Sequence, residues 1–408
     1  MPSPPPTLVR PRPEFLEDFE TRAAGLRAAL TELLASVDAD PSAPQDVSRR
    51  FGINRTMAWK VCRTVTSQDT CEVVQHLLGD SGVRILVAAF EAEGAPPAVA
   101  AAVHAAVDAF DHMVAEHAGS RAGLELMLTS MLPERVDPAR LESSHELAFQ
   151  GNSAVHGVQT RTRFGAQVVA PNAEQPDRVD VAMVTGHAGF RRLRPVTGWQ
   201  LSNSRVWGDG VRPHHEPLDA NLAPGDVPLL RQFCSGDLPA ITERAEGATR
   251  YHELGPGPVG NTAAFDVVFG WLDRSLAPIY GDAADDVAEH GLVQDTPAET
   301  LHFDLLLHHA LPVETVPRFC LVNLAQGRPQ PPHSQATSAQ LPWNTKVQSL
   351  GRPPSLAAPG FAGYGDVIAH ACERMGHGLD GFRAYRVTLR YPPVPSLVTL
   401  YYPLAQRS

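Results

Sequence analysis

The sequence predicts an α+β protein, in which an all-helical N-terminal domain precedes a larger mixed α+β domain. Two observations carry this prediction. Between residues 15 and 34, apolar residues recur at spacings of three and four, as on one face of a helix. After about Leu147, several segments alternate apolar and polar residues, as strands do. We therefore expect a disordered proline-rich arm over 1–13, a helical domain over 14–145 and an α+β domain over 146–408.

The composition limits the class of protein. The chain has 408 residues, of which 43% are hydrophobic and 19% charged, so we expect it to fold. A net charge of −11 argues against nucleic acid covering the whole surface, so any DNA contact must be local. The five cysteines are far apart and odd in number, which indicates free thiols in a reducing cytoplasm. The sequence has no secretory signal and no apolar run of about 18 residues, so we expect a cytoplasmic protein without a membrane partner.

The N-terminal elements follow in order. Residues 1–13 contain six prolines, which favour an extended arm. The first helix is predicted from Glu14, and its apolar face consists of Phe15, Phe19, Ala23, Leu26, Leu30, Leu33 and Leu34. Further helices are expected in TCEVVQHLL, in VRILVAAFEAEG, in the alanine-rich VAAAVHAAVDAFDHMVAEHAG and in RAGLELMLTSML. The alanine-rich surface predicts either a dimer interface or packing between these helices.

The segment Pro44–Arg63, PQDVSRRFGINRTMAWKVCR, has the spacing of a helix-turn-helix. Gly52 lies where a tight turn between two short helices needs a positive φ. The residues expected in its small core are Val47, Phe51, Ile53, Ala58 and Val61, and those expected on the outer face of the second helix are Asn54, Arg55, Thr56, Trp59, Lys60 and Arg63. The segment has five basic residues and one acid, Asp46, so its charge opposes that of the whole chain.

GINRTMAWKV resembles the turn and recognition helix of the helix-turn-helix domains of bacterial transcriptional regulators. The resemblance covers about twenty residues and departs from the family at Ser48, which is more often alanine there. It implies a double-stranded DNA partner, and that two copies in a homodimer read DNA one helical turn apart. The implied contacts divide into base edges, read by Asn54, Arg55, Thr56 and Lys60, and phosphates, held by Arg49, Arg50 and Arg63. Trp59 belongs to this DNA-binding face or packs on the neighbouring helices.

The C-terminal half is predicted to be mixed. The segments that read as strands are 158–169, 178–184, 300–309, 317–324, 384–391 and 399–404, and residues 364–375 read as a helix. The last two strands are joined by a proline-containing turn. Long loops rich in proline and glycine interrupt this domain, and long loops in a packed domain are often functional. The basic run 190–194 predicts either a contact to phosphates or an acidic ligand, or a strand end paired with surface acids.

Histidine-rich groups raise the question of a metal. The groups are His214, His215 and Glu216; His302, Asp304, His308 and His309; and His370, Cys372, Glu373 and His377. None has the spacing that makes a zinc site specific, although strand alternation places His302, Asp304 and His308 on one face. We therefore predict no metal, no cofactor and no catalytic residue.

The predicted function is a sequence-specific DNA-binding regulator, whose C-terminal domain serves ligand sensing, with a small-molecule effector, or oligomerisation. The first alternative is an enzyme with a histidine–carboxylate site in the C-terminal domain and a helical docking module. The second is a structural or assembly protein, in which Trp59 and the alanine-rich helices contact other subunits.

Overall fold

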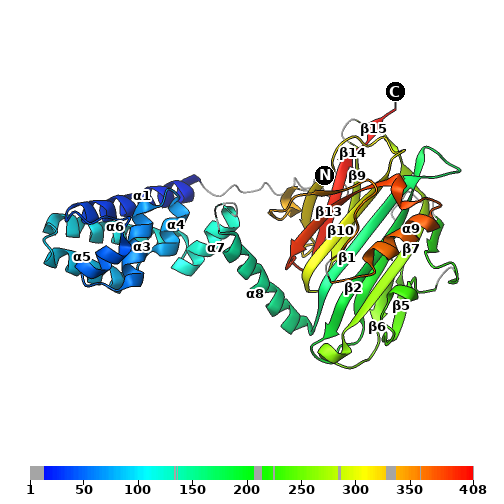
Figure 1. Cartoon of the computed structure of the whole chain (residues 1–408), viewed down its shortest axis with the longest axis horizontal. Helices are drawn as coiled ribbons and strands as arrows, with labels where there is room; N and C mark the ends of the chain where they lie inside the picture. The colour runs from blue at the N-terminus through cyan, green and yellow to red at the C-terminus, as the bar shows by residue number, and fades with distance from the viewer. Residues whose placement is uncertain are drawn as a thin grey trace, which may run out of the picture. The chain divides into compact units, whose positions relative to one another are not determined.

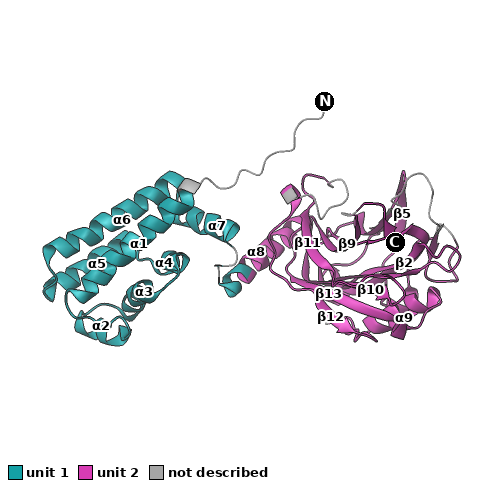
Figure 2. Cartoon of the chain, turned by 90° about the horizontal axis from the view of Figure 1, so that it is seen from above, with its two compact units in different colours: residues 1–141 teal, residues 142–408 magenta. Residues whose placement is uncertain are grey.

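The computed structural model describes residues 13–132, 135, 137–205, 214–223, 226–283, 286–327, 337–358 and 360–407. Nearly all of the predicted arm over residues 1–13 lies outside these residues. The chain divides into two compact units, residues 1–141 and residues 142–408, each of which is described by itself (Figure 2). The α+β class predicted from the sequence is confirmed, because helices form the first unit and sheets dominate the second (Figure 1).

The first unit is built from helices only. They are α1 (Pro13–Ala35), α2 (Pro44–Arg50), α3 (Arg55–Thr66), α4 (Thr70–His76), α5 (Asp80–Ala92), α6 (Pro97–His117), α7 (Arg121–Met131) and the start of α8 (Pro138–His156), which continues into the second unit. All seven residues predicted for the apolar face of the first helix are buried. They pack in one core with apolar residues of α3, α5 and α6, so the helices of this unit share a single interior.

One helix of the described part, α6, is long and apolar enough to cross a membrane by length and composition alone. Its Val103, Val107 and Phe110 are buried in the core of the helical unit. The pair α4 and α5 passes the same test only as one bent span, with a 90° break between the helices. Packing in this unit covers one face of α6, and a third of its apolar window is buried, while Ala98, Ala101, Ala102 and Ala105 are exposed.

The second unit contains the end of α8, helix α9 (Tyr364–Arg374) and all the strands. The strands are β1 (Val158–Pro171), β2 (Arg178–Arg192), β3 (Trp199–Arg205), β4 (His214–Pro217), β5 (Ile241–Glu246), β6 (Thr249–Leu254), β7 (Phe265–Pro278), β8 (Tyr280–Gly281), β9 (Val287–Gln294), β10 (Ala298–His308), β11 (Arg318–Asn323), β12 (Gln348–Gly351), β13 (Phe382–Arg390), β14 (Ser396–Pro403) and β15 (Ala405–Gln406). Each segment predicted as a strand overlaps one of these, and the predicted helix 364–375 is α9.

A seven-stranded sheet, in the order β12-β13-β10-β1-β2-β7-β4, forms the centre of this unit. β1 and β10 pair in parallel, and the other neighbours in this sheet are antiparallel. Helix α9 covers one face of the sheet, and the three-stranded sheet β11-β14-β9 packs on the other (Figures 1 and 2). The sheet β3-β6-β5 adds a separate apolar cluster around Phe190 and Phe269.

Successive side chains of β1 point to opposite faces of the large sheet, so one set of residues contacts α9 and the other faces the second sheet. Phe164, Ala166 and Val168 belong to the apolar cluster under α9. Arg163 and Gln167, which have the opposite parity, point to the side of the second sheet. The central strand therefore carries two polar side chains into the space between the sheets.

The last two long strands, β13 and β14, follow each other in the chain but belong to different sheets. β13 pairs with β10 and β12, whereas β14 pairs with β9 and β11. The proline-containing segment between them therefore crosses from one layer to the other instead of closing a hairpin.

Candidate functional site

The turn between α2 and α3 has the geometry that the sequence predicts. Gly52 has a φ of +62°, in the left-handed region that glycine adopts without a steric penalty. Helix α3 begins directly after Asn54, whose side-chain oxygen accepts a hydrogen bond of 3.0 Å from the N–H of Met57. This cap satisfies one of the free amides of the first helical turn and fixes where α3 starts.

The predicted core of this segment is confirmed. Val47, Phe51, Ile53, Ala58 and Val61 are all buried. The ring of Phe51 stacks on Phe90 of α5 at a centroid distance of 3.9 Å, which attaches the turn to the rest of the unit.

Three of the predicted site residues lie on the outer face of α3 without intramolecular partners. Arg55 and Thr56 are exposed and Lys60 is half-buried. Within the described part of the chain, their side chains make no hydrogen bond and no ion pair. Their polar groups are therefore available to an external partner.

The remaining basic residues of the predicted site have contacts within the helical unit, and Arg50 also donates to the Asp38 carbonyl at 3.3 Å. Arg49 pairs with Asp46 at 2.5 Å on α2. Arg50 lies over the Phe51 ring at 4.9 Å. Arg63 lies 3.5 Å from the Glu72 carboxylate. Such exposed ion pairs contribute about 0.2–1 kcal/mol, so they do not prevent these side chains from turning to another anion.

Trp59 is partly packed on a neighbouring helix and partly exposed. Its side chain is 49% exposed on the outer face of α3. One edge of it also contacts the ring of His76 on α4, with a centroid distance of 5.0 Å. The indole is therefore partly packed and still presents a surface to solvent.

The structure separates most members of the histidine groups or engages them with other side chains. No group of three or more histidine, cysteine, aspartate or glutamate side chains among the described residues is placed to hold a metal ion. His302 bonds to Thr388 at 2.9 Å. The ring of His308 lies tilted against those of His309 and His377, with centroids 4.3 and 4.4 Å apart. The side chain of His214 lies outside the described residues.

Asp304 has a structural role that the sequence did not reveal. Arg386 of β13 donates two hydrogen bonds of 2.7 Å to its carboxylate, and the Tyr364 hydroxyl of α9 donates a third of 2.8 Å. All three residues are buried. Burial, followed by the field of the Asp304 carboxylate, holds the pKa of Tyr364 well above its usual value. This cluster ties α9 to the large sheet and leaves Asp304 no free oxygen for catalysis.

The basic run 190–194 is occupied by internal contacts. Arg191 forms an ion pair of 3.7 Å with Glu299. Arg192 is buried and donates from Nε to the carbonyl of Val196 at 2.9 Å. Arg194 donates to the carbonyls of Val155 and His156. One of the three arginines is thus paired with an acid, and the other two donate to backbone carbonyls.

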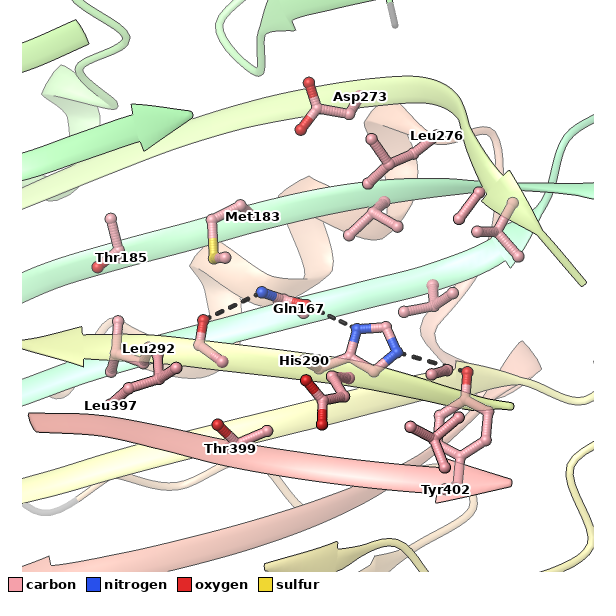
Figure 3. Close-up of a pocket in the computed structure, with 18 of the residues that line it drawn as sticks. Gln167, Met183, Thr185, Asp273, Leu276, His290, Leu292, Leu397, Thr399 and Tyr402 are labelled. Carbon is pink, nitrogen blue, oxygen red and sulfur yellow. Dashed lines mark hydrogen bonds between the residues drawn. The ribbon is translucent and has the colours of Figure 1, made fainter. Parts of the chain in front are cut away.

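The second unit contains a cavity of about 560 Å³ between the large sheet and the β9–β14 layer (Figure 3). Its volume lies in the range of small-molecule sites. Most of its wall is aliphatic and comes from Val169, Val179, Val181, Ile279, Leu292, Leu311, Val313, Leu397 and Leu404.

A hydrogen-bonded chain of three side chains lines part of this cavity. His290 Nδ1 lies 2.7 Å from the side-chain oxygen of Gln167, and the Gln167 amide donates to the carbonyl of Gly291. His290 Nε2 lies 3.4 Å from the hydroxyl of Tyr402. Figure 3 shows these side chains reaching toward one another from β1, β9 and β14. Burial lowers the pKa of His290 to about 4 and raises that of Tyr402, so both groups are neutral at pH 7.

One end of the cavity carries a buried cation. Arg163 is 4% exposed, and its Nη1 donates to the Thr185 hydroxyl at 2.6 Å and to the Gly186 carbonyl at 2.9 Å. Burial lowers the pKa of this guanidinium to about 10, so it stays charged at pH 7. The neighbouring Asp295 accepts from Gln200 at 2.9 Å, and burial raises its pKa. A positive charge is thus held in a mostly apolar space.

Sequence reasoning missed this cavity. A signal was present, because Arg163 and Gln167 share their parity with the apolar Val169 in a predicted strand. The opposing wall comes from β9 and β14, more than a hundred residues later in the chain, and no local pattern predicts that they meet.

Comparison with known proteins places neither unit in a family. No family model, no curated protein and no solved structure matches this chain.

Proposed function

We propose that this chain is a sequence-specific DNA-binding regulator of the cytoplasm, which acts as a homodimer. In this proposal α2, the Gly52 turn and α3 form a helix-turn-helix, and α3 enters the major groove of double-stranded DNA. The observation that carries the proposal is the outer face of α3, where Arg55, Thr56 and Lys60 have no side-chain partner within the described chain.

Charge supports the same surface. Residues 44–63 carry five basic residues and one acid, whereas the whole chain has a net charge of −11. An acidic body repels the DNA phosphates, so approach through the basic segment is favoured over other orientations.

The side chains divide into two groups of contacts in this proposal. Arg55, Thr56 and Lys60 read base edges, because they project from the exposed face of α3. The oxygen of Asn54 is engaged in the helix cap, so only its amide N–H groups remain for a base. The exposed cations Arg49, Arg50 and Arg63 bind phosphates, and Trp59 borders the groove.

Dimerisation and sensing complete the proposal. A single helix-turn-helix makes few contacts with DNA. A second copy one helical turn away, about 34–36 Å, adds affinity, and the two-fold symmetry of the dimer calls for a palindromic DNA site. The second unit provides the sensing part, since its cavity has the volume of a small-molecule site. The five free cysteines, of which four are buried and one is half-buried, support the reducing compartment.

The experiment begins with selection of bound fragments from a pool of genomic DNA by the full-length protein. The enriched duplex then serves in a fluorescence anisotropy titration. The variant Arg55→Ala/Lys60→Ala is expected to bind at least about tenfold more weakly, because each good base contact is worth about 1–3 kcal/mol. The matched control is Arg22→Ala/Arg84→Ala, which removes two exposed arginines from α1 and α5 of the same unit.

Salt dependence gives a second, independent result. A dimer that uses the side chains above should show a log–log salt slope of about −4 to −8, since each neutralised phosphate contributes roughly −0.9. Three outcomes would overturn the proposal: no enriched sequence, a slope near zero, or equal losses of affinity in the variant and the control.

A further inference from the structure

Three polar side-chain atoms of residues that line the cavity of the second unit have no hydrogen-bond partner, although each atom is itself buried. They are Nε of Arg163, Oγ of Ser202 and Oγ1 of Thr399. Their residues are 4%, 3% and 1% exposed, so bulk water does not reach them. An unsatisfied buried donor or acceptor destabilises a fold by the full desolvation cost of the group. A polar occupant that these side chains can turn toward would offset that cost.

Arg163 presents one free edge. Its Nη1 is saturated by three acceptors, the carbonyls of Phe164 and Gly186 and the hydroxyl of Thr185. Its Nη2 has only a long contact of 3.5 Å to the Val293 carbonyl, and its Nε has none. Nε and Nη2 form the side edge of the guanidinium, which matches the two oxygens of a carboxylate.

No carboxylate of the protein occupies this edge. Within the described residues, no aspartate or glutamate oxygen lies within 4.0 Å of Arg163, whereas the buried Arg386 is paired with Asp304 at 2.7 Å. The nearby Asp295 also lines the cavity and is bonded to Gln200 and Thr296, and its charge and that of Arg163 stabilise each other from beyond 4.0 Å. Asp295 compensates the buried cation only from a distance, and an anionic ligand in direct contact with Arg163 would add a charge-assisted pair.

The rest of the cavity is suited to a hydrocarbon chain. Along β1 the cavity is lined by Arg163, then Gln167 and then the aliphatic Val169, and β2 adds Val179 and Val181 beside Val169. Six strand residues of about 3.3 Å each give this path a length of about 20 Å. The polar chain of Gln167, His290 and Tyr402 is internally satisfied, so it requires no further group from a ligand.

We propose that this cavity binds an aliphatic monocarboxylic acid, with its carboxylate on the free edge of Arg163 and its chain along Val181 and Val169. The inference rests on the proposed role of the second unit as the sensing part of a regulator. It requires no DNA, so its test and the DNA-binding test succeed or fail separately.

The test measures binding of two probes to the full-length protein without DNA by isothermal titration calorimetry. Dodecanoate and 1-dodecanol have the same chain length, and only dodecanoate carries an anion. The unmodified protein is expected to prefer dodecanoate by about tenfold or more, because a charge-assisted pair forms only with the acid. In Arg163→Met this preference should disappear, while the affinity for dodecanol stays within about twofold.

The charge-matched control is Arg318→Met, which removes an exposed arginine of β11 outside the cavity and should retain the preference. A second variant, Val181→Trp, fills the apolar part of the cavity and should weaken the binding of both probes. Near-UV circular dichroism checks that each variant is folded, and the comparison of the two probes in the unmodified protein stands without any variant. The proposal is overturned if the unmodified protein binds neither probe or binds both equally, or if a folded Arg163→Met protein keeps the preference.

Discussion

The hydroxyl of Ser48 on α2 donates a hydrogen bond of 2.7 Å to the backbone carbonyl of Ile53, across the turn that leads into α3. Both residues are buried, so this bond satisfies a carbonyl that water does not reach. Alanine, the more usual residue at this position in the family that the segment resembles, has no hydroxyl to make it. The serine thus fixes the end of α2 relative to the start of α3.

Replacing Ser48 by alanine should lower the free energy of unfolding by about 0.5–1.5 kcal/mol, the usual net contribution of one hydrogen bond. Scanning calorimetry of the full-length protein measures the change. The matched control is Ser42→Ala, since the Ser42 hydroxyl bonds to Asp40 on the exposed surface. An equal effect of the two substitutions would show that the bond to Ile53 is not structurally important.

Replacing Gly52 by valine should destabilise the turn by about 1–2 kcal/mol, because a β-branched residue is strained at a φ of +62°. A Cβ at this position meets no atom within 4 Å, so the penalty comes from the backbone and not from a clash. Hydrogen exchange of peptides covering residues 44–66 should accelerate. Gly25→Ala, in the middle of α1 with equally open space, should leave exchange unchanged or slow it.

Replacing Asp304 by alanine should cost about 3–5 kcal/mol of stability, because it leaves the buried Arg386 without its carboxylate. The double variant Asp304→Leu/Arg386→Met removes both charges and should be less destabilised than the single variant. Urea unfolding followed by tryptophan fluorescence compares them. If the double variant loses more stability than Asp304→Ala, the unpaired charge of Arg386 does not explain the destabilisation of the single variant.

Stability should fall as the pH is lowered from about 6.5 to 4, and His290 should contribute. Burial lowers its folded pKa to about 4, whereas an unfolded histidine has a pKa near 6.5. Between these values the unfolded chain binds the proton that the folded protein excludes. The free energy of unfolding therefore decreases with falling pH by up to about 1.4 kcal/mol per unit for this one group. Above pH 7 the contribution is constant.

The variant His290→Gln removes this titration and should show a shallower loss of stability between pH 6.5 and 4 in urea unfolding experiments. His112→Gln serves as the control, because the side chain of His112 is 82% exposed. The groups that face His290 are Gln167 and Tyr402, and the charge of Glu289 acts against the burial effect. Identical pH profiles for both variants would contradict the assignment.

Local sequence patterns predicted where helices and strands lie. Which strands pair with one another depends on contacts between residues far apart in the chain. The apolar spacing from Phe15 to Leu34 identified the buried face of α1, because a helix repeats every 3.6 residues. The alternation in 158–169 identified β1, but not its parallel partner β10, which begins at Ala298. Gly52 and the buried set around it were readable for the same reason, since a turn is encoded by neighbouring residues.

The cavity and the Asp304 cluster could not be predicted from local sequence. Arg386 lies 82 residues from Asp304, and the pairing depends on the register of β10 and β13. The histidine group at 302–309 predicted a shared face but gave no partner for any member. The hydrogen-bond partners of these side chains lie on strands that are distant in the sequence, so local patterns do not predict them.

The position of β14 has a consequence for biosynthesis. This strand lies near the C-terminus, yet it is the middle strand of its sheet, between β11 and β9. Neither outer strand has another neighbour in that sheet until residues 396–403 have left the ribosome. The contacts of the helical unit join residues close in sequence, so this unit can assemble during translation. One wall of the cavity cannot form until residues 396–403 have been synthesised. A nascent chain stalled before residue 396 would therefore carry a folded helical unit and a large sheet whose apolar face is not yet covered by β14.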